Sequence, residues 1–220
     1  MSSEVDICNL ALSHLGDDGA VTAINPPDGT VQAAKCAVFY PIARGVVLER
    51  HPFRFNTRRA VLAVSPTTPP TGWDYAYTLP SDCVRPLAVI SPTALPDFEQ
   101  DGGVVSGIVT DTTNAQDFVC ESVAGGEQVI YTNVETATLL YAVLVTDTTK
   151  YTVECVAAIA RLLASYLAGV LIKGKAGIAV SDAQRKLFEA EFGMAATRDA
   201  NARQTNPYTT SAGAAAASRQ

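Results

Sequence analysis

Apolar residues near the N-terminus recur every three or four positions, which predicts an amphipathic helix. The repeating residues are Val5, Cys8, Leu12 and Leu15. Ser3 and Asp6 have the spacing of a capping box, in which each side chain accepts a hydrogen bond from the other residue's backbone. The Gly-Asp-Asp-Gly run at 16–19 is expected to end this helix.

A second helix is expected from about Thr30 to Arg50. Its predicted inner face comprises Ala33, Ala34, Ala37, Tyr40, Val47 and Leu48. Pro41 lies inside it and removes one backbone hydrogen bond, so we expect one kinked helix and not two separate helices. Pro52 ends the helix, because the residue before a proline disfavours helical backbone angles.

After Pro52 the sequence becomes rich in Thr, Val, Tyr and Gly, a composition that is typical of β-strands and their turns. Strands are predicted at 60–64, 85–90, 104–110, 118–122, 128–133 and 138–145. Their short spacing indicates an antiparallel meander or a small sandwich, not parallel βαβ units. Gly125-Gly126 predicts a hairpin between two of them.

Helical periodicity returns at Tyr151 and predicts a third helix to about residue 172. Its apolar repeat comprises Val153, Val156, Ala160, Leu163, Leu167 and Val170. Arg161 and Ser165 interrupt its apolar segment, which favours a buried helix over a membrane span. A fourth helix is expected from near Ser181, with Asp182 in its first turn. It carries Ala183, Leu187 and Ala190 on one face.

These elements together predict an α+β fold. Residues 1–52 and 150–198 would supply two helix pairs that close into a four-helix bundle. Residues 53–149 would form an antiparallel β-rich domain inserted between them. Residues 199–220 have too few apolar side chains to order themselves, so we expect an extended C-terminal arm.

Composition and charge narrow the classes of function that the chain can have. The net charge of −6 argues against a sequence-independent nucleic-acid binder, which needs a basic face. The five cysteines, at 8, 36, 83, 120 and 155, form no CxxC pair and no metal-binding spacing, as expected for reduced thiols in a cytosolic protein. The N-terminus lacks the pattern of a signal peptide. We expect no cofactor and no metal.

Three patterns look like catalytic or binding motifs and are interpreted otherwise. Residues 169–176 have the spacing of a Walker A loop, but they end a helix and place Ala176 where Ser or Thr is needed, so Gly174 is interpreted as a helix cap. The only histidines, His14 and His51, stand at expected helix ends and are interpreted as caps. The segment 97–102 approaches a calcium loop but has Ile108 where the bidentate Glu belongs.

One patch combines basic and aromatic side chains. It comprises Phe53, Arg54, Phe55, Arg58 and Arg59. Arginine and aromatic residues are enriched at interface anchors, so these residues are candidates for a subunit contact. The alternative is a strand entry in which the aromatics belong to the core and the arginines face water.

The stretch from Leu48 to Val89 contains three pieces in a particular order. They read Leu-Glu-Arg-His-Pro-Phe-Arg-Phe at 48–55, Arg-Arg-Ala-Val-Leu-Ala at 58–63, and Tyr-Ala-Tyr-Thr-Leu-Pro-Ser-Asp-Cys at 75–83. This order resembles the head-to-tail adaptor proteins of tailed bacteriophages, the family that includes tail tubular protein A. There the pieces read His-Pro-Trp/Phe-x-Phe, Arg-x-x-x-Leu-Ala and Tyr-x-Tyr-x-Leu-Pro-x-Asp-Cys. Phe53 stands where Trp is common.

The resemblance implies a structural virion protein without catalytic activity or cofactor. Such proteins form a ring, usually of twelve subunits, between the portal and the downstream tail or nozzle protein, and DNA passes through the lumen. The implied location is the head–tail junction, after synthesis in the host cytoplasm and without a membrane. It also implies a portal-docking arm, with Arg203, Asn206, Pro207 and Tyr208 as candidates. The alternative is a small cytosolic enzyme or regulatory domain that uses the loop carboxylates or Cys83.

Overall fold

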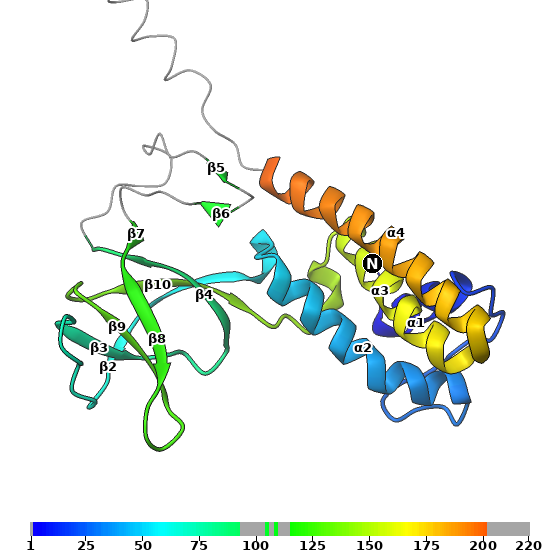
Figure 1. Ribbon diagram of the computed structural model, residues 1–220, viewed down its shortest axis with the longest axis horizontal. Coiled ribbons are helices and arrows are strands. Elements are labelled where there is room, and N and C mark those ends of the chain that lie inside the picture. The colour runs from blue at the N-terminus through cyan, green and yellow to red at the C-terminus, as the bar shows by residue number, and fades with distance from the viewer. Residues whose placement is uncertain (1, 93–103, 106–107, 110–114, 202–220) are drawn as a thin grey trace, which may run out of the picture.

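The computed structural model describes residues 2–92, 104–105, 108–109 and 115–201, and within them it combines α-helices with antiparallel β-sheets (Figure 1). The α-helices gather at one end of the molecule and the strands at the other. The helices are α1 (Glu4–Ser13), α2 (Val31–Arg50), α3 (Val153–Leu171) and α4 (Gly174–Asn201), with short 3₁₀ turns η1 (Arg54–Asn56) and η2 (Thr148–Lys150). The strands all lie between α2 and α3 in the chain.

Two antiparallel sheets of four strands each make up the β part. The first has the order β1–β10–β4–β7, and the second has the order β2–β3–β9–β8. Their bounds are β1 (Thr57–Val61), β2 (Ala63–Val64), β3 (Tyr75–Thr78), β4 (Cys83–Ile90), β7 (Ala115–Gln116), β8 (Phe118–Ser122), β9 (Gln128–Thr132) and β10 (Thr138–Val143). A separate pair joins β5 (Val104–Val105) to β6 (Ile108–Val109).

Side chains from both sheets form one apolar core. It includes Leu62, Tyr77, Val89, Ile130, Leu139 and Tyr141. The hairpin predicted at Gly125-Gly126 is confirmed, because β8 pairs with β9 across it and both glycines have positive φ angles. Of the strand predicted at 104–110, the described residues show only β5 and β6.

Helix α3 contacts each of the other three helices and is therefore the centre of the helical core. Leu163 and Leu167 are fully buried, as the periodicity predicts. The prediction of burial was wrong at the two ends of that repeat, because Val153 is 81% exposed and Val170 is exposed as well. Val153 is the first residue of α3 and Val170 is the last but one.

The N-terminal elements follow the sequence closely. Ser3 caps α1 in a capping box with Asp6, as predicted. Thr30 caps α2 by accepting a hydrogen bond from the backbone of Ala33. The α2 helix runs unbroken through Pro41, which confirms one helix in place of two.

Three expectations for the helices are corrected. Helix α4 begins at Gly174, not near Ser181, because the turn after α3 is so tight that a Cβ on Gly177 would lie 1.8 Å from the carbonyl oxygen of Ile172. Its buried face comprises Phe188, Phe192 and Ala195, whereas Ala183, Leu187 and Ala190 are exposed. In α2, Ala34 is exposed and not part of the inner face.

The C-terminal end of α4 also differs from the expected boundary. The helix continues to Asn201, so Asp199 is helical and not part of an extended arm. Helices α2 and α3 are long and apolar enough to cross a membrane by length and composition alone, and both contribute buried residues to the helical core.

Candidate functional site

The site of interest is the junction where the chain passes between the helices and the sheets. It passes once after α2 and once before α3. Phe55 lies on the first passage and Tyr151 on the second, with ring centroids 5.5 Å apart. Both side chains pack against the helical core and against the sheet core. This aromatic pair therefore joins the two cores.

The sequence folds this way because Pro52 stops α2 and the next residues turn back under it. Phe53 is fully buried in the helical core and stacks on Phe55, with ring centroids 5.3 Å apart. Asn56 is also buried, and its Nδ2 donates a 2.9 Å hydrogen bond to the carbonyl oxygen of Leu48. This bond satisfies one of the carbonyls that the end of a helix leaves without a partner in the helix.

The end of α4 is attached to the same turn. The Nε2 atom of His51 lies 3.3 Å from one carboxylate oxygen of Asp199, and both side chains are largely buried. The other carboxylate oxygen of Asp199 accepts a 3.2 Å hydrogen bond from the backbone N–H of Arg54. The His51 ring also packs edge-on against Phe53 at 4.6 Å. Chain segments far apart in sequence thus meet at one point.

The Leu-Pro-Ser-Asp-Cys corner closes the other side of the junction. Asp82 accepts a 2.7 Å hydrogen bond from Arg58 on β1 and a 3.1 Å hydrogen bond from the hydroxyl of Tyr141 on β10. Arg85 of β4 donates to the carbonyl oxygens of Glu49 and Arg50 at the end of α2. The corner therefore ties the first sheet to the C-terminal end of α2.

The predicted subunit-contact residues divide into two groups. Phe53 is not an interface residue in this structure, because its side chain lies in the chain's own core, and Phe55 is half-buried. Arg54, Arg58 and Arg59 are exposed. The arm candidates Arg203, Asn206, Pro207 and Tyr208 lie outside the described residues.

The side chains considered for catalysis lie in surroundings that are typical of structural residues. His14 and His51 are the C-caps of α1 and α2, as predicted. Burial raises the pKa of the Cys83 thiol to about 11, so little reactive thiolate is present at neutral pH. The loop carboxylates Asp97, Glu99, Asp101 and Asp111 lie outside the described residues. Within the described part of the chain, no three His, Cys, Asp or Glu side chains are placed to hold a metal ion.

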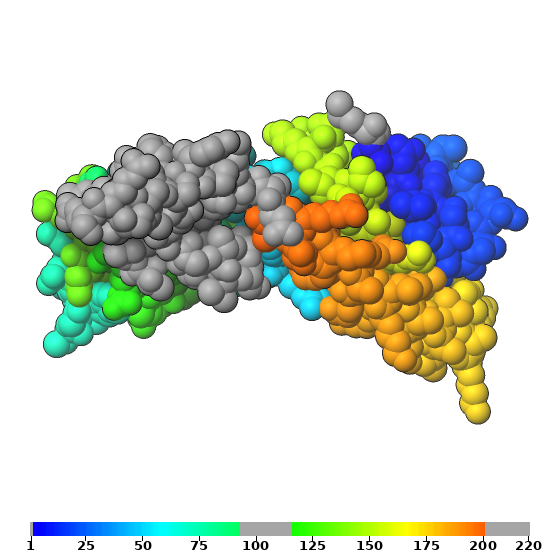
Figure 2. All heavy atoms as spheres, turned by 90° about the horizontal axis from the view of Figure 1, so that it is seen from above, coloured from blue at the N-terminus to red at the C-terminus, as the bar shows by residue number. Residues whose placement is uncertain are grey.

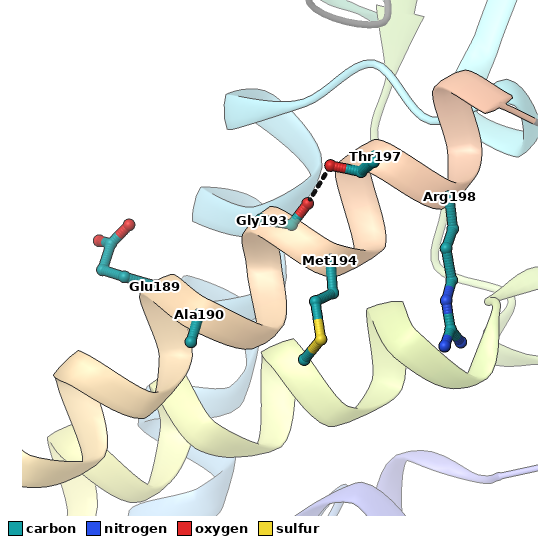
Figure 3. A pocket seen from close by; sticks show the side chains of 6 residues that line it. All are labelled: Glu189, Ala190, Gly193, Met194, Thr197 and Arg198. Atoms are coloured by element: carbon teal, nitrogen blue, oxygen red, sulfur yellow. Dashed lines mark hydrogen bonds between the residues drawn. The ribbon is translucent and has the colours of Figure 1, made fainter.

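A shallow hollow of about 500 Å³ lies on α4 (Figure 3). Its lining comprises Glu189, Ala190, Gly193, Met194, Thr197 and Arg198. All six belong to one helix, and Thr197 donates its hydroxyl hydrogen bond to the carbonyl oxygen of Gly193. A hollow made by one helix has no opposing wall to enclose a small molecule.

Sequence reasoning missed Asn56, Asp199 and Tyr151 as members of the junction. Asn56 had a usable signal, since a polar residue within an aromatic run after a helix often satisfies backbone groups. Asp199 and Tyr151 had none, because their partners lie far away in the sequence.

No protein-family model matches this chain, and no curated protein is significantly similar to it. Any functional assignment therefore depends on the residue pattern and on the geometry of the junction.

Proposed function

We propose that this protein is a head-to-tail adaptor of a tailed bacteriophage. It would form a ring, of twelve subunits by resemblance to the family, between the portal and the tail. The ring would continue the DNA channel, and it would need neither catalysis nor a cofactor. The proposed location is the head–tail junction of the virion.

The observation that carries this proposal is the convergence of the three signature pieces on one junction. The first piece supplies His51, Phe53 and Phe55, which join the helical core to the passage into the sheets. The second supplies Arg58, and the third supplies Asp82, which pair with each other. A motif whose members contact one another supports a shared structural purpose better than residues scattered over the surface.

The proposed fold of the adaptor has three parts. Residues 1–52 and 150–198 would form a four-helix bundle, and residues 53–149 an inserted β-rich domain. The junction would hold these two parts in a fixed relation, as a ring component needs. Of the arm expected at 199–220, Asp199 to Asn201 belong to α4, so residues 202–220 would supply the arm that docks on the portal.

The charge of the chain suits a channel through which DNA must slide. A lumen lined with Lys and Arg would bind phosphates and release their counterions, and so would retain DNA. A subunit with a net charge of −6 gives a ring with a strongly negative total charge. This total charge would disfavour retention of the DNA that the ring surrounds.

The test is negative-stain electron microscopy of the purified protein mixed with its cognate portal protein. We expect an added ring beneath the portal, and a monomer or mixed oligomers in the absence of the portal. Absence of any added density, together with a defined small oligomer and a measurable turnover, would favour the alternative of a small enzyme.

A variant carrying Arg54→Ala, Arg58→Ala and Arg59→Ala tests whether the exposed arginines contribute to the ring. We expect lower ring occupancy on the portal with an unchanged far-UV circular dichroism spectrum. Lys173→Ala, an exposed cation in the turn between α3 and α4, is the matched control and should assemble normally.

A further inference from the structure

Helix α2 has an exposed apolar stripe on the face opposite its buried residues. The stripe comprises the exposed Val31, Ala34, Val38 and Pro41 and the half-buried Gly45, with the exposed Ile42 and Val46 beside it. The spacing of the first five is three, four, three and four, which is the seam of a coiled coil. Val38, in the middle, is 57% exposed. We call these five residues the α2 seam.

Helix α4 carries a second seam with the same spacing. The α4 seam comprises Val180, Ala183, Leu187, Ala190, Met194 and Thr197. Leu187 is 46% exposed and Met194 is 54% exposed. The face that the sequence predicted as apolar is thus real, but it does not face the core of its own chain. Figure 2 shows α4 at the surface of the helical part.

An outer helix of a protein that functions alone normally shows a polar face to water. Here α2 and α4 both show apolar seams, and the two helices, seen in Figure 1, approach each other where Arg50 of α2 pairs with Glu189 of α4. Contiguous exposed apolar surface of this kind marks a binding face. Two such faces on different helices require two separate contacts to cover them.

We propose that the α2 seam of one copy packs against the α4 seam of the next copy. The occupant of each seam is therefore another molecule of the same chain. This inference rests on the proposed ring and deepens it by naming the contact between subunits. The contact is heterologous, so every copy uses both of its seams, and the chain of contacts can close into a ring.

The two seams are similar in length and complementary in side-chain size. The α2 seam spans about 21 Å and the α4 seam about 26 Å, at a rise of about 1.5 Å per residue. On α4, the long side chains of Leu187 and Met194 alternate with Ala183 and Ala190. On α2, the small Ala34 leaves room between Val31 and Val38, and Gly45 leaves room after Pro41. Long side chains of one seam can therefore enter the gaps of the other, as in coiled-coil packing.

The size of the contact explains why a ring, and not a stable dimer, is expected. A seam about 20 Å long on a helix about 10 Å wide buries only a few hundred Å² per subunit. Stable interfaces bury about 800 Å² per partner. A single pair should dissociate readily, whereas a closed ring or a portal template holds many weak contacts together.

A lipid surface fits less well than a second copy. Membrane-surface helices carry Lys and Arg along the border of the apolar face. The α2 seam is bordered by one lysine, Lys35, and has Glu49 beyond its end, and the nearby Arg44 is held by a 2.9 Å ion pair to Glu4.

Site-directed cross-linking tests the contact in the full-length chain. In a Cys83→Ser/Cys120→Ser background, Val38→Cys protein is mixed with Leu187→Cys protein and oxidised, with and without portal. We expect the mixed cross-link to exceed both self-cross-links at least about tenfold. Val64→Cys, an exposed position on β2, replaces Val38→Cys as the matched control and should give background levels. Dominant self-cross-links, or no excess over the control on the portal, would overturn the proposal.

Charge substitution separates failure of this contact from failure of the adaptor function. Val38→Asp and Leu187→Asp should each abolish rings on the portal, while Val64→Asp should not, with all three variants folded. If the aspartate variants still form rings, the adaptor function stands and the seam contact is wrong.

If the mixed cross-link forms but the portal binds no copy, the contact stands and the adaptor function is wrong. Flotation of the protein with anionic vesicles, lost in Val38→Asp, would replace the contact with a membrane.

Discussion

Arg58 on β1 and Asp82 in the corner before β4 form a 2.7 Å ion pair. The second carboxylate oxygen of Asp82 accepts the hydroxyl hydrogen of Tyr141 on β10. Asp82 therefore connects the corner with two neighbouring strands of the first sheet. Both charged side chains are partly exposed, so water and salt weaken the ion pair itself.

The first prediction follows from the two contacts of Asp82. Arg58→Ala removes a surface ion pair and should cost at most about 1 kcal/mol. Asp82→Ala also leaves the Tyr141 hydroxyl without its acceptor, so it should cost about 1–2 kcal/mol. Urea unfolding of both variants and of the double variant measures this. A larger cost for Arg58→Ala than for Asp82→Ala would show that the carboxylate does not hold the corner.

The second prediction concerns the core of the helices. Leu163 is fully buried on α3, so Leu163→Ala should lower the free energy of unfolding by about 2–5 kcal/mol through lost apolar contacts and a cavity. Val153→Ala, on the same helix but 81% exposed, should change stability by less than about 0.5 kcal/mol. Equal effects of the two substitutions in urea unfolding would contradict the central position of α3.

Local signals in the sequence predicted much of this structure. The Ser3–Asp6 capping box, the end of α2 at Pro52 and the glycine hairpin each depend on residues near one another, and each is present. Periodicity also located the seam of α4, yet it could not say which face meets the core. The same three–four spacing fits a core contact and a contact with another chain.

The junction was less predictable because its contacts join distant segments. Asp199 reaches His51 across 148 positions. A sequence reading that ends the last helix at Asp199 discards this partner. Tyr151 likewise packs on Phe55 only because both passages between the two cores lie side by side. The tight turn before α4 is a further case, because the close approach of Gly177 to the carbonyl oxygen of Ile172 joins residues whose contact no local pattern announces.

The third prediction concerns alkaline pH. Burial raises the pKa of the Tyr40 hydroxyl above its usual value near 10. The folded state favours the protonated hydroxyl. Its contribution to the free energy of unfolding is therefore complete below about pH 10 and is lost as the pH rises through the folded-state pKa. Tyr40→Phe should therefore lose less stability than the natural protein between about pH 9 and about pH 12.

Urea unfolding at several pH values measures this difference. Tyr166→Phe, a half-buried tyrosine on α3, is the control and should follow the natural protein. A Tyr40→Phe variant with an unchanged pH dependence would show that this hydroxyl ionises freely in the folded state.

The fourth prediction compares two truncations at the C-terminal end. Removal of 202–220 leaves α4 complete to Asn201 and keeps the Asp199 carboxylate beside His51 and the backbone N–H of Arg54. Its thermal midpoint should equal that of the full chain. Removal of 199–220 deletes the carboxylate and leaves the largely buried His51 without it, so it should cost about 1–3 kcal/mol.

Portal binding should separate the two effects. If residues 202–220 include the docking arm, the shorter deletion assembles poorly on the portal although it is fully folded. Asp199→Ala in the full-length chain supplies the opposite case: it loses stability at the junction but keeps the arm, so it should load onto portals at a temperature well below its unfolding midpoint. Wild-type occupancy of the 202–220 deletion would refute the docking arm and leave the seams and the exposed arginines as the remaining candidate contacts of the proposed ring.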